Sequence, residues 1–362
     1  MAYKARETVS LEQLDYMKRY FAEETYDDYK AGEFTRRRML KRLTYLFGSS
    51  AVVASFLVAC GDPTATGVPA PTTAAPTTVA ATTTSAATTA AATTTAATTT
   101  TAASGATTTA AAPPPAATPG PAKGPLVVAA TDPAVKGADI TFQSDTPILA
   151  YMAEPSAAGT YPGVIVIHEN RGLTDHIKDV ARRLAKVGYV AIAVDLLSRE
   201  GGTDKVTFDK RPASLTVQGA QDKFIKDLNA GVTYLEGLKQ VKTGKYGVVG
   251  FCFGGNYTLL LAANNPKIAA AVPYYGTTPQ PPSVMAATNA AILGQYGATD
   301  SRVDNTIPDL EKVMKDSSKT FEKKLWDGAG HAFNNDTGGS FNETAAVGAW
   351  QGTTAWFDKY LK

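Results

Sequence analysis

The motif that most constrains this chain is Gly-x-Cys-x-Gly at residues 250–254, which directly follows the apolar run 246–249. A helix-like stretch, 256–263, comes next, so the motif stands between a predicted strand and a predicted helix. The two glycines are needed because a sharp strand-to-helix turn crowds the backbone and leaves no room for a Cβ atom. Such a turn is typical of a nucleophile elbow, which lifts one side chain above a sheet. We therefore predict that Cys252 is a nucleophile, against the alternative of a small, inert, buried thiol.

The composition excludes several other classes of protein. The net charge of +2 is too small to indicate a nucleic-acid partner. The chain has 2 cysteines and 3 histidines, which excludes a disulfide scaffold. No Cys/His cluster has the spacing of a zinc site, so we expect no metal ion. With 362 residues, of which 44% are hydrophobic, the chain can bury a substantial core in one or two domains.

Residues 1–60 have the pattern of a targeting sequence rather than of a folded domain. Residues 1–34 are polar and mostly charged, and we interpret them as a cytoplasmic leader. Residues 35–41, Thr-Arg-Arg-Arg-Met-Leu-Lys, resemble a twin-arginine export signal, because a basic segment followed by an apolar stretch is the general secretory pattern.

The apolar stretch 43–59 ends in Leu-Val-Ala-Cys, which resembles a bacterial lipobox with Cys60 as the lipidated residue. Its length of roughly 17 residues corresponds to about 26 Å of helix. That is short for a bilayer core of about 30 Å, so a cleaved signal is favoured over an uncleaved anchor. In either case we expect the rest of the chain to be exported and held at the extracytoplasmic face of the cell membrane, by a lipid anchor at Cys60 in the favoured case.

Residues 61–125 are nearly all Thr, Ala and Pro. They show no apolar periodicity, so we predict a disordered tether. The folded domain is then expected to cover 126–362 and to be monomeric.

Within 126–362, short apolar runs alternate with longer helical patterns, which predicts an α/β fold with a mainly parallel sheet flanked by helices. The predicted strands are 140–143, 148–153, 164–167, 190–194, 246–249, 269–273, 291–295 and 320–326. The predicted helices are 177–187, 218–239, the stretch after Cys252, 308–316 and 344–360.

A thiol of ordinary pKa needs a base to activate it at neutral pH. The best candidate is His331, in a glycine-containing loop just after the last predicted strand. The chain order nucleophile, acid, histidine then requires a carboxylate between the two, and Asp300 follows the strand 291–295. Asp304 is the rival acid, and for both aspartates a capping or solvated role is the alternative.

A second informative segment is the buried strand 164–167, which runs straight into the polar residues His-Glu-Asn-Arg. Such a loop supplies half of an oxyanion hole, and we predict the backbone N–H groups of Asn170 and Phe253 as its two donors. Glu169 could face the thiol or instead pair with Arg171. His168 and His176 are expected to orient the loop and to cap a helix rather than to catalyse.

Taken together, these motifs resemble those of the dienelactone hydrolase (carboxymethylenebutenolidase) family. The resemblance covers roughly 135–361 and rests on the segments 168–173, 175–177, 188–191, 250–255, 297–300 and 330–333. It implies an α/β-hydrolase fold with about eight strands and a triad of Cys252, Asp300 and His331. It also implies that the loop glutamate, Glu169, hydrogen-bonds the resting thiol.

The implied reaction is hydrolysis of a small ester or lactone through a thioester on Cys252, without a cofactor. One departure concerns the substrate: the family's arginine after the catalytic histidine is absent from residues 333–336. Arg171, Arg199 and Arg211 could supply positive charge from other loops. The alternatives are a non-catalytic exported lipoprotein that binds a small ligand in the same cleft and, on the Thr/Ala tract alone, a wall spacer.

Overall fold

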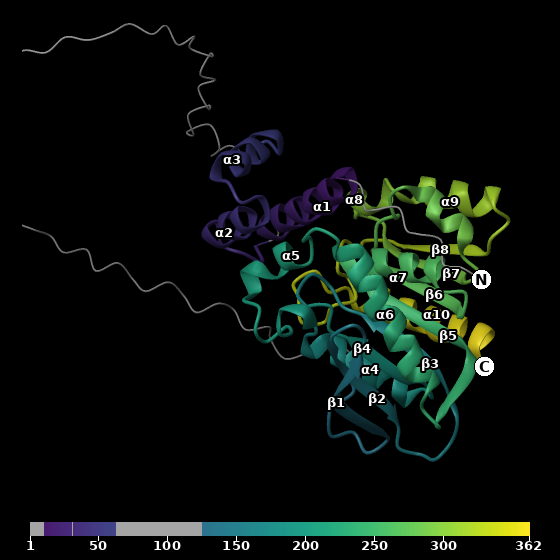
Figure 1. The fold of residues 1–362 in the computed structure, drawn as a ribbon. Coiled ribbons are helices and arrows are strands. Elements are labelled where there is room, and N and C mark those ends of the chain that lie inside the picture. Colours follow the sequence, from purple (N-terminus) through teal and green to yellow (C-terminus); the bar gives the residue numbers. More distant parts are fainter. Residues whose placement is uncertain (1–10, 31, 63–124) are drawn as a thin grey trace, which may run out of the picture.

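The computed structural model describes residues 11–30, 32–62 and 125–362 (Figure 1). The leader residues 1–10 and almost all of the predicted tether 61–125 lie outside the described residues. In Figure 1 an α/β domain carries two purple helices along its upper edge, and a third helix projects beyond them.

The α/β domain is built on one eight-stranded sheet with the strand order β1-β2-β4-β3-β5-β6-β7-β8. The first two strands pair antiparallel and β2 pairs antiparallel with β4, whereas the remaining neighbours are parallel. The strands are β1 (Val135–Gln143), β2 (Pro147–Pro155), β3 (Tyr161–Ile167), β4 (Val190–Val194), β5 (Val241–Phe251), β6 (Ile268–Tyr274), β7 (Ala291–Gly297) and β8 (Phe321–Trp326). Each contains or overlaps one predicted strand, so the predicted α/β-hydrolase sheet is confirmed.

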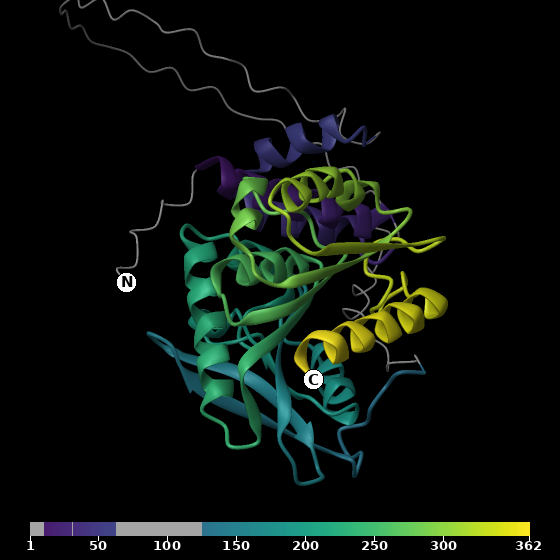
Figure 2. The ribbon, with the colours of Figure 1, turned by 90° about the vertical axis from the view of Figure 1, so that its right-hand side faces the viewer.

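Helices cover both faces of this sheet, which is why its central strands are apolar on both sides. Every residue of β4 is buried, as are the last six of β3. In Figure 2, α10 lies on one face of the sheet and α6 on the other. The main helices of the domain are α4 (Asp175–Lys186), α6 (Ala220–Glu236), α7 (Phe253–Asn264), α9 (Ile307–Asp316) and α10 (Glu343–Leu361). Shorter pieces are α5 (Arg211–Ser214), α8 (Ser301–Asp304), η2 (Ser198–Glu200), η3 (Phe208–Lys210) and η4 (Pro282–Ala287).

The helices that precede the tether belong to the same packed body, which corrects the expectation that the fold begins near Leu126. They are α1 (Leu11–Lys30), α2 (Arg36–Phe47) and α3 (Ser50–Ala59). Phe21 of α1 and Met39 of α2 are fully buried and belong to the same hydrophobic cluster as the sheet. The sequence did not predict this docking, because the polar residues of α1 resemble a solvated leader until their partners are known.

The apolar stretch 43–59 is not one continuous helix. Gly48, with φ 70°, ends α2, and the two helices around it are bent by 118°. Among the described residues no single helix has the length and apolarity to cross a membrane; by these two measures alone, the bent pair formed by α2 and α3 does.

Candidate active site

Cys252 stands in the sharp turn that the motif predicted. It links β5 to α7 with φ 56° and ψ −118°, a backbone conformation that L-residues rarely adopt. A Cβ atom on Gly250 would lie 2.2 Å from the carbonyl oxygen of Gly254, and one on Gly254 would lie 2.4 Å from that of Ile167. Both glycines are therefore required by close backbone contacts, as the sequence indicated.

His331 and Asp300 are brought to the thiol from the loops that follow β8 and β7. The Nδ1 atom of His331 lies 2.5 Å from Oδ2 of Asp300. Burial lowers the pKa of His331, but the charge and hydrogen bond of Asp300 outweigh burial and hold it well above its usual value. Asp304, the rival acid, makes no contact of this kind, and burial together with the charge of Asp300 raises its pKa to about 6.

A glutamate from α1 completes the site, and it is not among the residues predicted from the sequence. The thiol of Cys252 donates a hydrogen bond of 2.9 Å to Oε1 of Glu24, and the hydroxyl of Tyr20 lies 3.4 Å from the sulfur. Oε1 of Glu24 is also 3.5 Å from Nε2 of His331, while Oε2 accepts a bond of 2.5 Å from the side-chain amide of Asn170. No motif marks Glu24, since it is one of several acidic residues on a polar helix.

These contacts set the charges of the site. Burial raises the pKa of Glu24, but hydrogen bonding and charge from His331, with help from Arg302, lower it to about 2. Burial and the negative charge of Glu24 raise the pKa of the Cys252 thiol to about 11, against the opposing effect of His331. At neutral pH the site, with α1 in place, therefore holds a neutral thiol beside an ionised Glu24 and a protonated imidazole. The donor atoms of Glu24, Cys252 and His331 lie within 4.8 Å of one another, a spacing that could also hold a metal ion.

Glu169 does not bind the thiol, which corrects the role that the family resemblance implied. Its carboxylate accepts hydrogen bonds of 3.2 Å from the hydroxyl of Tyr275 and 2.7 Å from the side-chain amide of Asn335. The physical reason is competition: with α1 in place, the carboxylate of Glu24 is the acceptor that the thiol reaches. Glu169 instead ties the loop after β3 to the loop that carries His331.

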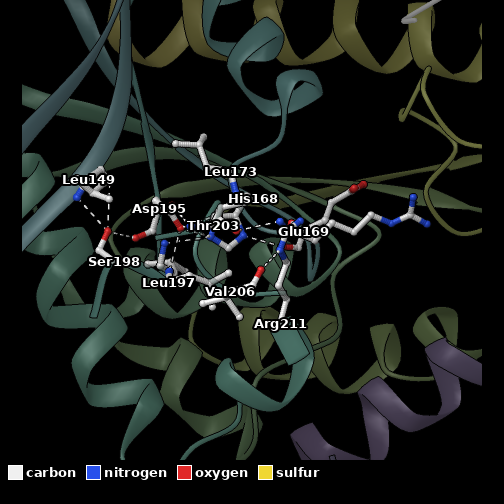
Figure 3. A network of polar contacts seen from close by, with 12 residues as sticks. Leu149, His168, Glu169, Leu173, Asp195, Leu197, Ser198, Thr203, Val206 and Arg211 are labelled. Atoms are coloured by element: carbon white, nitrogen blue, oxygen red, sulfur yellow. Dashed lines mark hydrogen bonds and ion pairs between the residues drawn. The ribbon is translucent and has the colours of Figure 1, made fainter. Parts of the chain in front are cut away.

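The loop after β3 is braced by a buried polar network (Figure 3). Nε2 of His168 accepts a bond of 3.0 Å from the backbone N–H of Leu196, so Nδ1 carries the proton and donates to the carbonyl of Glu169 at 2.6 Å. Burial lowers the pKa of His168, so its ring stays neutral. Asp195 accepts bonds from the backbone N–H and the hydroxyl of Thr203. As expected from the sequence, His168 orients the loop that presents Asn170.

The three arginines predicted to bind substrate are placed differently. Arg211 donates to the backbone carbonyls of Arg171, Thr203 and Val206, at 2.7, 2.9 and 3.1 Å.

Arg199 pairs with the carboxylates of Asp145 and Asp227. Both Arg199 and Arg211 therefore brace the fold. Only Arg171 faces the site from the loop, with Nη2 3.8 Å from the carboxylate of Asp28 on α1. The predicted oxyanion donors are well placed in the fold: Phe253 is the first residue of α7, where backbone N–H groups lack helical partners, and Asn170 lies in the facing loop.

Comparisons with known proteins show which family this chain belongs to. Residues 148–361 match the family model of the dienelactone hydrolase family. A protein of Methylorubrum extorquens assigned as a carboxymethylenebutenolidase is 35% identical over 227 residues, which are 60% of this chain and 78% of the relative. A Bradyrhizobium protein assigned as a 2-oxo-3-(5-oxofuran-2-ylidene)propanoate lactonase is 36% identical over 225 residues, 59% of this chain and 90% of that protein.

Among solved structures, a Klebsiella pneumoniae protein assigned as a dienelactone hydrolase superimposes with a TM-score of 0.58 and 32% identity. The match covers 63% of this chain and 100% of that chain. The matched family range begins at residue 148, so α1 with its Glu24 lies outside it. From the eight-stranded sheet, the Cys252 turn and these matches it follows that the chain belongs to the dienelactone hydrolase family.

Proposed function

We propose that this protein hydrolyses a small ester or lactone through a thioester on Cys252. The observation that carries the proposal is the convergence of a thiol on a strained turn, an imidazole within 4.8 Å of it and a carboxylate 2.5 Å behind that imidazole. Membership of a hydrolase family supports it, as do relatives that are named as a carboxymethylenebutenolidase and a lactonase.

The first half of the reaction forms the acyl-enzyme. The thiol proton passes to Nε2 of His331, and the sulfur attacks the substrate carbonyl carbon. The carbonyl oxygen becomes an oxyanion, for which the backbone N–H groups of Phe253 and Asn170 are the proposed donors. Each such donor is typically worth about 3 to 4 kcal/mol in the transition state. As the oxyanion collapses, the C–O bond of the ester breaks and His331 returns its proton to the leaving alkoxide.

The second half releases the acid. His331, again neutral, takes a proton from water as the water oxygen attacks the thioester carbonyl. The C–S bond breaks, and the proton on His331 restores the thiol of Cys252. Asp300 holds the ring with Nδ1 protonated in both halves and stabilises the imidazolium.

Arg302 indicates the class of substrate. It stands two residues after Asp300, and its Nε and Nη1 atoms have no hydrogen-bond partner among the described residues although the side chain is largely buried. Its guanidinium lies 4.4 Å from the ring of Tyr20, the residue that touches the sulfur. With α1 docked, Nε of Arg302 lies 3.7 Å from the carboxylate of Asp27. Once that contact is released, the guanidinium can form a charge-assisted pair with a substrate carboxylate. We therefore propose that the substrate carries a carboxylate and that Arg302 supplies the cation missing after His331.

The test is direct observation of the acyl-enzyme. The chain should be prepared with Cys60→Ser, so that Cys252 is its only thiol. After incubation with a small activated ester, mass spectrometry should find the acyl group on the peptide that contains Cys252. Cys252→Ala should lower turnover at least about a thousandfold, since a nucleophile is removed, whereas Cys60→Ser alone should leave turnover unchanged. Unchanged turnover in Cys252→Ala would exclude the proposed mechanism and favour the ligand-binding alternative.

We also propose that the enzyme is exported and anchored by a lipid at Cys60. The supporting features are the consecutive arginines that begin α2, the apolar helix α3 and the lipobox-like residues that end at Cys60.

A further inference from the structure

The catalytic thiol is covered by a helix that precedes the export pattern. Cys252 is only 1% exposed, and Tyr20 and Glu24 of α1 both touch its sulfur. The ring of Phe21 on the same helix lies 5.5 Å from the ring of Phe253, beside the thiol. A substrate carbonyl must come within about 3 to 3.5 Å of the sulfur to react. Side chains of α1 fill that space.

The carboxylate of Glu24 contacts the polar groups that the reaction needs. Its Oε1 lies 2.9 Å from the sulfur and 3.5 Å from Nε2 of His331, and Oε2 is held by Asn170. The nitrogen that must accept the thiol proton therefore faces a carboxylate. The closed arrangement stabilises a neutral thiol and a charged imidazole, which is the wrong distribution of protons for attack.

The interface that the helices α1 and α2 form with the α/β domain has complementary charges. On α1, Asp27 lies 3.7 Å from Arg302, and Asp28 lies 3.8 Å from Arg171.

On α2 the signs are reversed: Arg38 and Lys41 bind the carboxylate of Asp209 at 3.0 and 2.9 Å. Arg38 is one of the three arginines of the predicted export signal. In the docked state part of the signal is thus held by the domain whose export it directs.

Docking and membrane crossing are geometrically incompatible. The apolar residues of α3 separate α1 from the α/β domain in the chain. If the chain crosses a bilayer at this point, α1 and Cys252 lie on opposite sides of about 30 Å of hydrocarbon. Cleavage before Cys60 would likewise leave α1 behind. Either event uncovers the thiol.

We propose that the catalytic face of the α/β domain is a docking site for α1. While α1 is docked the enzyme is closed, because the carboxylate of Glu24 occupies the space beside the sulfur that the acyl group of a substrate would need. The enzyme opens when α1 is separated from the domain. This inference rests on the proposed function for its effect on hydrolysis, but not for its effect on access to the thiol. The open enzyme is the exported form, and the closed enzyme is the form in which leader and domain share one compartment.

The experiment measures access to Cys252 and hydrolysis in parallel, in the full chain with Cys60→Ser. Phe21→Asp places a charge in a fully buried position and should undock α1. The apparent rate of a reaction that needs the open form scales with the open fraction. We therefore expect iodoacetamide to modify Cys252 about tenfold faster or more in this variant, and ester turnover to rise in parallel. The matched control is Glu23→Gln, because Glu23 pairs with Arg19 on the same helix; it should change neither rate.

A second arm removes the question of whether the variant folds. A site for a specific protease is inserted after Asp62 in the otherwise unchanged chain, which is cut after folding and diluted. Release of α1 should raise both rates again. Equal alkylation rates before and after cutting would overturn the proposal, as would faster alkylation with lower turnover, since α1 would then belong to the catalytic machinery. If alkylation becomes faster but no form of the protein hydrolyses the ester, the docking of α1 over the thiol is supported and the proposed hydrolase activity is overturned.

Discussion

At the scale of single residues, the site combines positions marked by motifs with one that no motif marks. The turn at Cys252 and the loops of Asp300 and His331 lie together in the fold, with His331 against Asp300 and within 4.8 Å of the thiol. The thiol-facing carboxylate was predicted to be Glu169 and is Glu24. Spacing along the chain carried no information on that contact, which joins residues 228 positions apart.

The role of Arg302 can be tested by comparing two substrates. In Arg302→Gln we expect KM for a carboxylate-bearing ester to rise roughly tenfold to a hundredfold, because a charge-assisted hydrogen bond contributes about 1.5–3 kcal/mol. KM for a neutral ester of the same size should stay within about twofold if no such contact is lost. Arg199→Gln is the matched control, since Arg199 pairs with Asp145 and Asp227. An equal effect of Arg302→Gln on both esters would show that Arg302 does not bind the carboxylate.

At the scale of elements, the alternation of apolar runs located all eight strands and the five main helices of the domain. The predicted strand 190–194 agrees with β4 at both ends, whereas 246–249 covers only the centre of β5 (Val241–Phe251). Strand ends such as Lys242 and Lys245 are polar and exposed, so their extended conformation depends on neighbouring strands rather than on hydrophobicity. The docking of α1 was not predictable from periodicity, because its partners come from four separate loops.

Docking of α1 should depend on pH through Asp28. Burial and the charge of Glu24 raise the pKa of Asp28 to about 6, against the opposing charge of Arg171. A carboxyl group whose pKa is raised on docking stabilises the docked state while it is protonated. This contribution is complete when the pH is below its ordinary pKa of 3.8, and it is lost as the pH rises through about 6. Glu24, with its pKa lowered to about 2, opposes docking only below its ordinary 4.5. Between pH 4.5 and 6 Glu24 is ionised in both states and therefore adds no pH dependence of its own.

The measurement is hydrogen exchange of the α1 amides, corrected for the intrinsic effect of pH. From pH 5 to pH 7 we expect the free energy of opening α1 to fall by about 1 kcal/mol, a value reduced for the partial exposure of Asp28. Asp28→Asn cannot ionise and should make the opening free energy nearly independent of pH over this range. If the pH dependence of Asp28→Asn equals that of the unchanged chain, another group controls docking.

At the scale of the whole molecule, two structural units share one chain and one interface. The α/β domain contains the sheet and the residues of the proposed triad, and helix α1 lies against Cys252 and His331. In Figures 1 and 2 the helices α1 and α2 lie along one edge of this domain. An enzyme closed by its own leader cannot hydrolyse esters before it reaches its destination. This couples location to activity without a second protein.

Export predicts a specific mature form. The membrane-bound protein should begin at Cys60, carry a lipid there and lack α1, because a lipobox is cleaved before its cysteine. Intact mass of the membrane fraction and labelling with radioactive palmitate measure both properties. Cys60→Ser should abolish the label and leave the whole chain uncut. A membrane-bound chain that keeps α1 would contradict this maturation.

The sequence by itself determined the sheet and the sharp turn at Cys252, because close glycine contacts and the alternation of buried strands are local requirements that appear as local patterns. The tertiary structure alone decided what lies against the thiol. The contacts of Glu24 with Cys252, His331 and Asn170 join a polar helix to three separate loops. Their energy comes from burial and charge complementarity that exist only after the chain has folded, so a helix that resembles a solvated leader becomes the cover of the active site.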